Sequence, residues 1–255
     1  MKARVCCAHH GPMEAEQTEK QLLKSIDWAP LLWIVLAFGT MSATNWLGLA
    51  LLKHSAIVDE SLAKLLADIF SSLVFYLLLW LPIWRDGAVS SAGGGIDNLG
   101  STAKKFLIFL AVLTPFGINL LWFLATSSAD GFARNILAES QQFQGLLLLA
   151  FWSSNVLLFM VGVILAPIVE ERFFRQWFWK RLEPRGLPST IVSTSITFIL
   201  IHPVDLVGKI ALVPLTALVV FARIRSGGPN FGIWLHGINN VVAIMVAQVL
   251  VARFQ

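Results

Sequence analysis

The chain alternates long apolar runs with short polar connections. A helix needs about 20 apolar residues to cross a bilayer, so the long runs predict transmembrane helices. The shorter runs must borrow flanking residues or tilt in order to span. The runs lie at about 29–52, 69–84, 106–129, 140–169, 186–201, 210–222 and 226–252. The pattern predicts an all-α fold, a polytopic membrane helix bundle with about seven transmembrane helices.

Composition and charge support this fold class. Of the 255 residues, 56% are hydrophobic and only 13% are charged, whereas soluble domains have about 25% charged residues. With the N-terminus in the cytoplasm, 14 of the 19 Lys and Arg residues fall in cytoplasmic segments, as the positive-inside rule requires. The net charge of +4 is then an orientation signal. Because no soluble basic domain is present, we expect no nucleic-acid partner.

Residues 1–28 are predicted to form a cytoplasmic tail. Cys6 and Cys7 are the only cysteines and are adjacent, which rules out a structural disulfide framework. With the histidines that follow they can chelate a metal, but the absence of apolar periodicity favours a mobile tail. The first apolar run begins near Ala29, so we expect no cleaved secretory signal. Residues 14–27 form either a surface helix on the membrane or a plain leader into the first span.

Tryptophans gather near the ends of the predicted spans. The chain has ten tryptophans and a single tyrosine. Trp and Tyr concentrate at membrane interfaces, where the apolar ring and its polar group are both solvated. We therefore interpret five tryptophans as interfacial anchors: Trp28, Trp33, Trp84, Trp177 and Trp179.

Glycine-rich stretches mark two of the connections. The stretch 90–100 lacks the strand-to-helix context and the lysine of a phosphate loop, so we interpret it as a flexible cytoplasmic loop. Gly227-Gly228-Pro229 predicts a turn between the last two spans.

Ionisable side chains stand within or beside three of the apolar runs. Glu170 and Glu171 follow a run without any charged residue, and two later runs carry His202 and His236. Charged groups in a bilayer cost several kcal/mol, and proteins keep them mainly for ion pathways, relays or catalysis. With a rise of about 1.5 Å per residue, the three helices bring these groups to overlapping depths. We therefore expect them to meet in a small hydrated site that opens toward the cytoplasm.

The acidic pair divides into two roles. Glu171 and Arg175 are four residues apart on one helical face, a spacing that permits an ion pair. Glu170 points about 100° away around the helix and is left for a different task. We assign Glu170 as a base, with Glu171 and Arg175 as its supports. The alternative is that all three lie in solvated headgroups beyond the end of the span.

These residue types can hydrolyse a peptide bond. A carboxylate beside an imidazole can take a proton from water, which then attacks a carbonyl carbon. His236 and Asn240 lie one helical turn apart and can direct donors at the oxyanion that develops. The chain has no His-Glu-x-x-His motif, no Gly-x-Ser-x-Gly motif and no cysteine in any predicted span. The chemistry predicted is hydrolysis without a covalent intermediate.

Three short motifs in the C-terminal half resemble a known family. Glu170-Glu171-x-x-x-Arg175, Phe198-x-x-x-His202 and His236-x-x-x-Asn240 are similar to the signature motifs of the CPBP intramembrane proteases. That family includes CAAX prenyl endopeptidases and bacteriocin-processing or immunity proteins. The resemblance implies an all-helical membrane core.

The resemblance also implies roles for individual residues. It implies that Glu170 and His202 activate water, that His236 and Asn240 stabilise the oxyanion, and that Phe198 is a supporting residue. No cofactor is then required. The alternative is a zinc enzyme with Glu170, His202 and His236 as ligands.

The resemblance leads to a division of the chain and to a function. We expect a tail at 1–28, N-terminal transmembrane helices at 29–139 and a catalytic core at 140–255. The expected function is an intramembrane endopeptidase, with membrane lipid and a membrane-anchored or lipidated peptide or protein as partners. The expected location is a bacterial inner membrane, with the N-terminus in the cytoplasm. The alternatives are a noncatalytic scaffold or immunity protein of the same family, or a proton-coupled transporter.

Overall fold

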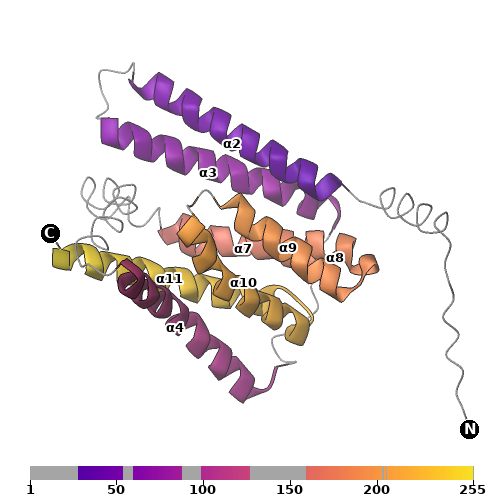
Figure 1. Cartoon of the computed structure of the whole chain (residues 1–255). Helices are drawn as coiled ribbons and strands as arrows, with labels where there is room; N and C mark the ends of the chain where they lie inside the picture. The colour runs from indigo at the N-terminus through magenta and orange to yellow at the C-terminus, as the bar shows by residue number, and fades with distance from the viewer. Residues whose placement is uncertain are drawn as a thin grey trace, which may run out of the picture.

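Helices make up all the regular structure that the computed structural model describes (Figure 1). It describes residues 28–53, 60–87, 99–126 and 159–254, apart from residues 203 and 205. The predicted all-α fold is confirmed for these residues. The predictions for the tail with Cys6 and Cys7, for the glycine-rich stretch up to residue 98 and for residues 140–158 lie outside the described residues.

The N-terminal part contributes three long helices. α2 (Ala29–Lys53) and α3 (Glu60–Arg85) lie side by side along one edge of the bundle, while α4 (Ser101–Thr126) lies on the opposite side (Figure 1). Within α2, residues Ala29–Leu51 are long and apolar enough to cross a membrane, and within α3 the same is true of Leu66–Arg85. α2 has nearly the same bounds as the predicted run at 29–52, whereas α3 and α4 begin several residues before their runs at 69–84 and 106–129.

The fourth run continues as one helical rod whose hydrogen-bond register changes along its length. Two π-helical stretches, η2 (Met160–Leu165) and η3 (Phe173–Phe178), enclose the short α-helix α7 (Ala166–Arg172). α8 (Trp179–Leu182) and the 3-10 turn η4 (Glu183–Arg185) complete the rod. The chain remains helical through Pro167.

Three further helices complete the bundle: α9 (Leu187–Ile201), α10 (Leu206–Ser226) and α11 (Asn230–Phe254). α9 has Pro188 in its first turn, where the missing N–H costs no helical hydrogen bond. The predicted turn between α10 and α11 is also found, and Gly227 supplies its positive φ of 74°.

Seven helical rods are therefore present in the described residues if residues 160–185 count as one rod. Two of these rods meet the length and hydropathy needed to cross a membrane. α9 and residues Asn230–Val246 of α11 are shorter apolar helices. The number of spans, about seven, stays a prediction.

Two apolar clusters hold the bundle together. The first joins α2 and α3 to the rod of α7 and η3 and to α9, with Phe75, Leu79, Phe173, Trp177 and Phe198 among its buried side chains. The second joins α4, α10 and α11. The acidic pair on α7 belongs to the rod of the first cluster, and His236 belongs to the α11 helix of the second. The candidate site therefore lies where the two clusters meet.

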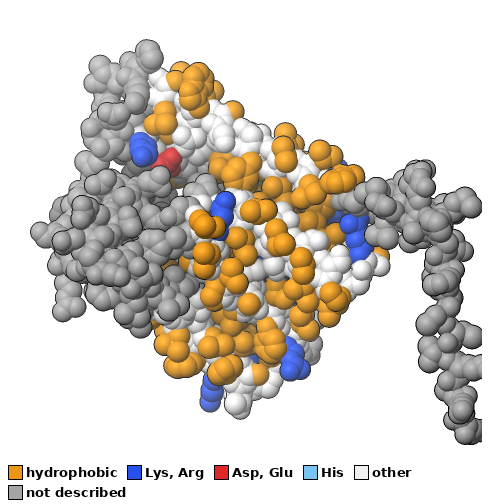
Figure 2. Space-filling view, viewed as in Figure 1, with side chains coloured by type: hydrophobic (Ala, Val, Ile, Leu, Met, Phe, Trp, Pro, Cys, Tyr) orange, Lys and Arg blue, Asp and Glu red, His pale blue; other side chains and the backbone are white. Residues whose placement is uncertain are grey.

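The exterior of the bundle is apolar. Figure 2 shows hydrophobic side chains spread across one face, with few Lys and Arg side chains among them. Trp46 is 72% exposed and Leu77 is 62% exposed, although both lie in the helices able to cross a membrane. Such surfaces are stable in contact with lipid.

Two of the tryptophans assigned as interfacial anchors are buried inside the protein. Trp177 is 1% exposed and Trp179 is 3% exposed. The anchor interpretation was wrong for these two residues, because the segment from Phe173 to Trp179 that carries them is buried throughout by neighbouring parts of the protein. Trp28 and Trp84 are exposed, at 54% and 71%, as anchors should be.

Candidate active site

Glu170 and Glu171 are buried at the centre of the bundle, on α7. Glu170 is 4% exposed and Glu171 is 0% exposed. π-helical turns flank α7 on both sides, and such turns are frequent at functional sites. The alternative that these acids lie in solvated headgroups is therefore wrong, because both carboxylates are enclosed by protein.

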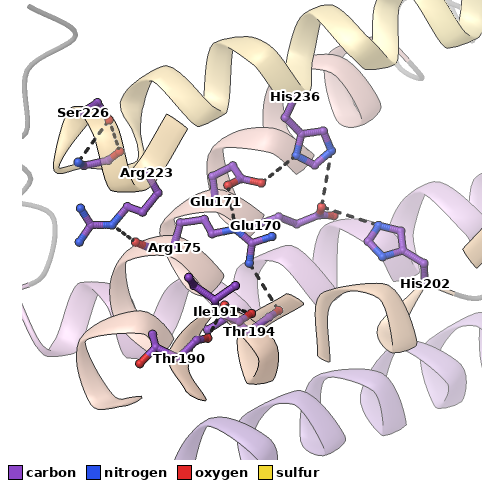
Figure 3. A network of polar contacts seen from close by, with 11 residues as sticks. Glu170, Glu171, Arg175, Thr190, Ile191, Thr194, His202, Arg223, Ser226 and His236 are labelled. Atoms are coloured by element: carbon purple, nitrogen blue, oxygen red, sulfur yellow. Dashed lines mark hydrogen bonds and ion pairs between the residues drawn. The ribbon is translucent and has the colours of Figure 1, made fainter. Parts of the chain in front are cut away.

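The carboxylate of Glu170 faces both histidines (Figure 3). Its Oε2 atom lies 3.8 Å from Nε2 of His202 and 3.9 Å from Nε2 of His236. Neither distance is a hydrogen bond, and Oε2 has no hydrogen-bond partner among the described residues. The structure thus brings together three of the four side chains proposed as catalytic, around one free carboxylate oxygen.

His202 is placed by the end of α9. The helix stops at Ile201, and His202 has an extended backbone with ψ of 124°. Residue 203 is a proline, and the residue before a proline is pushed out of the helical region. Nδ1 of His202 is 2.7 Å from the carbonyl oxygen of Phe198. A carbonyl only accepts, so Nδ1 carries the proton, and in the neutral ring Nε2 presents its lone pair toward Glu170.

His236 on α11 is held by the second acid. Its Nδ1 is 3.1 Å from Oε1 of Glu171, and Nε of Arg175 is 3.6 Å from the other oxygen, Oε2. The predicted pairing of Glu171 with Arg175 is therefore found. α11 can come this close because residue 232 is glycine: a Cβ there would lie 3.3 Å from Oε2 of Glu171.

The ring of Phe198 lies beside both histidines and Arg175. Its ring centroid lies 4.7 Å from that of His202 and 5.8 Å from that of His236. The guanidinium carbon of Arg175 lies 5.2 Å from the same ring centroid. A cation over an aromatic face is attracted by the ring quadrupole. Phe198 thus packs against both histidines and against Arg175.

Asn240 is bound to the rod through a carbonyl that a proline leaves free. Ala166 donates its backbone N–H to Val161, five residues back. In the same register Pro167 would donate to Gly162, but proline has no N–H. The side-chain amide of Asn240 donates to this carbonyl oxygen at 2.8 Å. Asn240 lies one turn from His236, yet its hydrogen bond runs to the backbone of η2 rather than to the acids.

A second backbone carbonyl, that of Arg175, accepts from a side chain at the other end of the rod. The N–H of Trp179 bonds to Gln176, three residues back, so the carbonyl of Arg175 lacks its usual helical donor. Nε of Arg223, on α10, donates to this oxygen at 2.7 Å. Side chains from α10 and α11 therefore fix both π-helical stretches around the acidic pair.

Tyr76 is a site residue that the sequence analysis did not identify. Its hydroxyl, on α3, donates to Oε1 of Glu170 at 3.1 Å. The signal available was composition: it is the single tyrosine of the chain and stands within an otherwise apolar run. With Oε1 bound by Tyr76, the other oxygen of Glu170 is left facing the imidazoles.

A cavity of about 160 Å³ adjoins this carboxylate. Glu170 and His202 form one wall together with Ile201. The opposite wall comes from α2 and α3 and includes Phe38 and Phe75. The structure thus has a cavity at the site, while its hydration and its opening toward the cytoplasm stay predictions.

The donor atoms do not fit zinc as they are placed. Two ligands of a tetrahedral zinc lie roughly 3.3 Å apart when each bond is about 2.0–2.1 Å. Oε2 of Glu170 is instead 3.8 and 3.9 Å from the two imidazole nitrogens. In the described part of the chain, no group of three or more His, Cys, Asp or Glu side chains has an arrangement suited to a metal ion. No step below therefore uses a metal.

Comparison with known proteins shows a family similarity over this part of the chain. Residues 152–242 match the family described as type II CAAX prenyl endopeptidase Rce1-like. The match covers all three motifs and confirms, for this part of the chain, the resemblance to the CPBP proteases. At the family level it indicates a membrane peptidase. The searches of curated proteins and of solved structures gave no match.

Proposed function

We propose that this protein is an intramembrane endopeptidase in which Glu170 activates a water molecule. One observation supports the proposal above all others: a buried carboxylate oxygen without a protein donor faces the Nε2 atoms of two imidazoles at 3.8 and 3.9 Å. Polar atoms separated by more than 3.5 Å are commonly bridged by water. A single water within about 2.8 Å of both Glu170 and His202 would span the gap between them.

The protonation of His202 suits this water. Nδ1 of His202 donates to the carbonyl of Phe198, so the neutral ring offers an acceptor at Nε2. Oε2 of Glu170 is also an acceptor. Water has two hydrogens and can donate one to each, which orients its oxygen lone pair toward a substrate carbonyl. The two bases thus hold and polarise the nucleophile.

Hydrolysis then proceeds in two proton transfers. The water oxygen bonds to the carbonyl carbon as its proton moves to Glu170, and the carbonyl oxygen becomes an oxyanion. The C–N bond then breaks as Glu170 returns the proton to the leaving nitrogen. The products are a new carboxyl group and a new amine, and Glu170 is again ionised.

His236 is the proposed donor to the oxyanion. Nδ1 of His236 is bound to Glu171. Nε2 is therefore the ring atom that faces the site, and a hydrogen on this atom is aimed at the oxyanion. Asn240 uses one amide hydrogen on Gly162 and keeps the other. Preorganised donors of this kind stabilise the developing charge more than the substrate.

The surroundings of Glu170 support a substrate class. Its carboxylate lies among apolar helices, which favours a membrane-anchored or lipidated peptide or protein, in contact with membrane lipid, as the substrate. We propose a bacterial inner membrane with the N-terminus in the cytoplasm. No cofactor is required by the steps above.

The test is cleavage of membrane peptides by the purified full chain. Glu170→Gln should lower kcat by about 10²–10⁴-fold, the usual contribution of a general base. Glu183→Gln, an exposed acid in the 3-10 turn, is the matched control and should leave cleavage unchanged. A chelator should also leave the wild-type rate unchanged.

Three outcomes would contradict the proposal. Unchanged cleavage by Glu170→Gln would remove Glu170 as the base. Loss of activity with chelator, restored by zinc, would make Glu170, His202 and His236 metal ligands. A wild-type protein that binds membrane peptides without cleaving them would instead be a noncatalytic scaffold.

A further inference from the structure

We propose that Asp68, on α3, binds a positively charged side chain of the substrate, about three or four residues from the scissile bond. The proposal rests on the proposed function, because it takes Glu170 as the place where the peptide is cut. It adds a cationic residue to the features that the protein recognises, and it assigns this recognition to the hairpin of α2 and α3.

Asp68 is an acid that the proposed reaction does not use. It lies near one end of the segment Leu66–Arg85, which is long and apolar enough to cross a membrane. Its neighbours Leu66 and Phe70 are exposed apolar residues. An ionisable residue within an apolar span is costly and therefore marks a functional site. Because Asp68 is only half-buried, a ligand can reach its carboxylate.

Asp68 belongs to the face of α3 that lines the cavity. Ser72, Phe75 and Tyr76 line the cavity, and Asp68 precedes them by four, seven and eight residues. Residues at these spacings share one face of a helix. Glu170 lines the same cavity. This face of α3 therefore leads from the proposed catalytic base to Asp68.

Asn45 holds the carboxylate of Asp68 from the neighbouring helix α2. Its Nδ2 atom donates to Oδ1 of Asp68 at 2.6 Å and to Oγ of Ser71 at 3.3 Å. Met41 and Phe38 line the cavity four and seven residues before Asn45, so all three share one face of α2. An amide carries no charge, so it orients the carboxylate without neutralising it.

The distance along α3 sets the position of the cationic residue in the substrate. Tyr76 bonds to Glu170, and Asp68 stands eight residues earlier in the helix. With a rise of about 1.5 Å per residue, this separation is about 12 Å. An extended peptide covers about 3.3 Å per residue, so three or four residues reach from the scissile bond to Asp68.

The surroundings of Asp68 favour a basic side chain of the substrate. An ammonium or guanidinium group forms a charge-assisted hydrogen bond with a carboxylate, and this attraction strengthens where water is excluded. An acidic side chain would be repelled. Lipid headgroups can also carry an ammonium group, but the exposed outer face of α3 is occupied by Leu73 and Leu77. Asp68 shares the cavity face instead, which favours the substrate as its ligand.

The test compares cleavage of a membrane peptide with versions carrying Lys, Gln or Glu at the third or fourth position on either side of the scissile bond. At one of these positions, wild-type kcat/KM should favour Lys over Gln about fivefold or more, and Gln over Glu. Exposed ion pairs contribute up to about fivefold, and a half-buried pair contributes more.

The matched variant is Asp68→Asn, which removes the charge and keeps an oxygen that can accept from Asn45. It should bring kcat/KM for the Lys and Gln peptides within about twofold of each other, because the ion pair alone separates them. Its unfolding temperature in detergent should stay close to that of the wild type. Asp68→Lys should reverse the order, so that the Glu peptide is cleaved best. Glu183→Gln, in the exposed 3-10 turn, is the control and should keep the Lys preference.

Three results would overturn the proposal. They are equal cleavage of the Lys, Gln and Glu peptides by the wild type, a Lys preference that survives in Asp68→Asn, and a dependence on amino lipids, abolished by Asp68→Asn, without any peptide preference. In a Glu170→Gln background, peptide binding should show the same preference without hydrolysis. Undiminished cleavage by Glu170→Gln would contradict the proposed base and leave the Lys preference standing.

Discussion

Glu170 owes its position to side chains from three other helices. Tyr76 on α3 binds Oε1, while His202 after α9 and His236 on α11 face Oε2. The two oxygens thus have different surroundings, one bound by protein and one left for solvent. Tyr76 is on this account a positioning residue, which acts through the carboxylate it holds.

Removal of the Tyr76 hydroxyl should impair turnover more than binding. Tyr76→Phe keeps the ring but deletes the donor to Glu170, so the carboxylate can rotate away from the histidines. Since a hydrogen bond to a charged group contributes about 1.5–3 kcal/mol, kcat should fall about tenfold or more, with KM changed less than about twofold. Steady-state kinetics on one membrane peptide measure both.

Thr114→Val is the matched control for this substitution. It deletes a hydroxyl that bonds within α4, at 2.7 Å from the carbonyl of Leu110, away from the site. Its kcat should match the wild type. If Tyr76→Phe also retained full kcat, the hydroxyl would have no part in positioning Glu170.

The motif residues could be found from the sequence, but Tyr76 could not. Glu170, His202 and His236 stand out because ionisable groups are costly in an apolar run. Tyr76 and Glu170 are 94 residues apart in the chain, and their contact depends on how α3 packs against α7. No spacing rule within one helix predicts such a pair.

The rod from η2 to α8 sets the site at the level of elements. Backbone carbonyls of its two π-helical stretches are bound by Asn240 from α11 and by Arg223 from α10. All six residues of η3 are buried. Hydrophobic periodicity therefore carried no information about the faces of this segment, and the π register could not be predicted from it.

The close approach of α11 to η2 is testable at Gly237. A Cβ at this position would lie 3.1 Å from the carbonyl oxygen of Val163. Gly237→Ala should push α11 away and displace His236, one residue earlier. Overpacking of this kind costs about 1–3 kcal/mol, so both cleavage and the midpoint of thermal unfolding in detergent should fall.

Gly162→Ala provides the comparison on the facing segment. No atom lies within 4 Å of a Cβ built at Gly162. Alanine is favoured over glycine in helices by about 0.5–1 kcal/mol, so this variant should be neutral or slightly stabilised. Equal cleavage rates and equal unfolding midpoints for the two variants would show that α11 and η2 do not require close contact at Gly237.

In the part of the molecule that the structure describes, a hairpin of α2 and α3 is attached to a bundle of the other helices. Asp86, just after α3, binds the rod of η3 and α8. Its Oδ2 accepts a hydrogen bond from Trp177 at 2.7 Å and another from Arg181. The guanidinium of Arg181 also stacks 4.0 Å from the ring of Trp177. This cluster ties the end of the hairpin to α8.

Asp86 should make the attachment dependent on pH. Hydrogen bonds from Arg181, and then from Trp177, hold the pKa of Asp86 below its usual value. A carboxylate with a lowered pKa stabilises the fold at pH values above its pKa in the unfolded chain, about 3.9. That stability is lost as the pH falls through its pKa in the folded protein. The side chain is 27% exposed, so the effect should be about 1 kcal/mol or less.

Thermal unfolding from pH 3 to pH 7 checks this expectation. Asp86→Asn should unfold at a lower temperature than the wild type at pH 7, and the two midpoints should converge below about pH 4. Curves that stay parallel over the whole range would mean that the carboxylate of Asp86 does not stabilise the fold.

The fold class followed from the sequence because apolar runs and sparse charge leave few alternatives to a membrane helix bundle. The arrangement of the helices relative to one another did not follow from the sequence. Trp177 and Trp179 resembled interfacial anchors in the linear sequence, yet both are buried by neighbouring helices. Which helix lies beside which depends on side-chain packing between distant segments, and one sequence does not display it.

The central claim is that Glu170 activates water and does not attack the substrate itself. Single-turnover cleavage in water enriched in oxygen-18 tests it, with mass spectrometry of the products and of the protein. The account predicts one labelled oxygen in the new carboxyl group of the product and none in the side chain of Glu170. Label in the Glu170 carboxylate would show that it had formed a covalent intermediate, which would contradict the account.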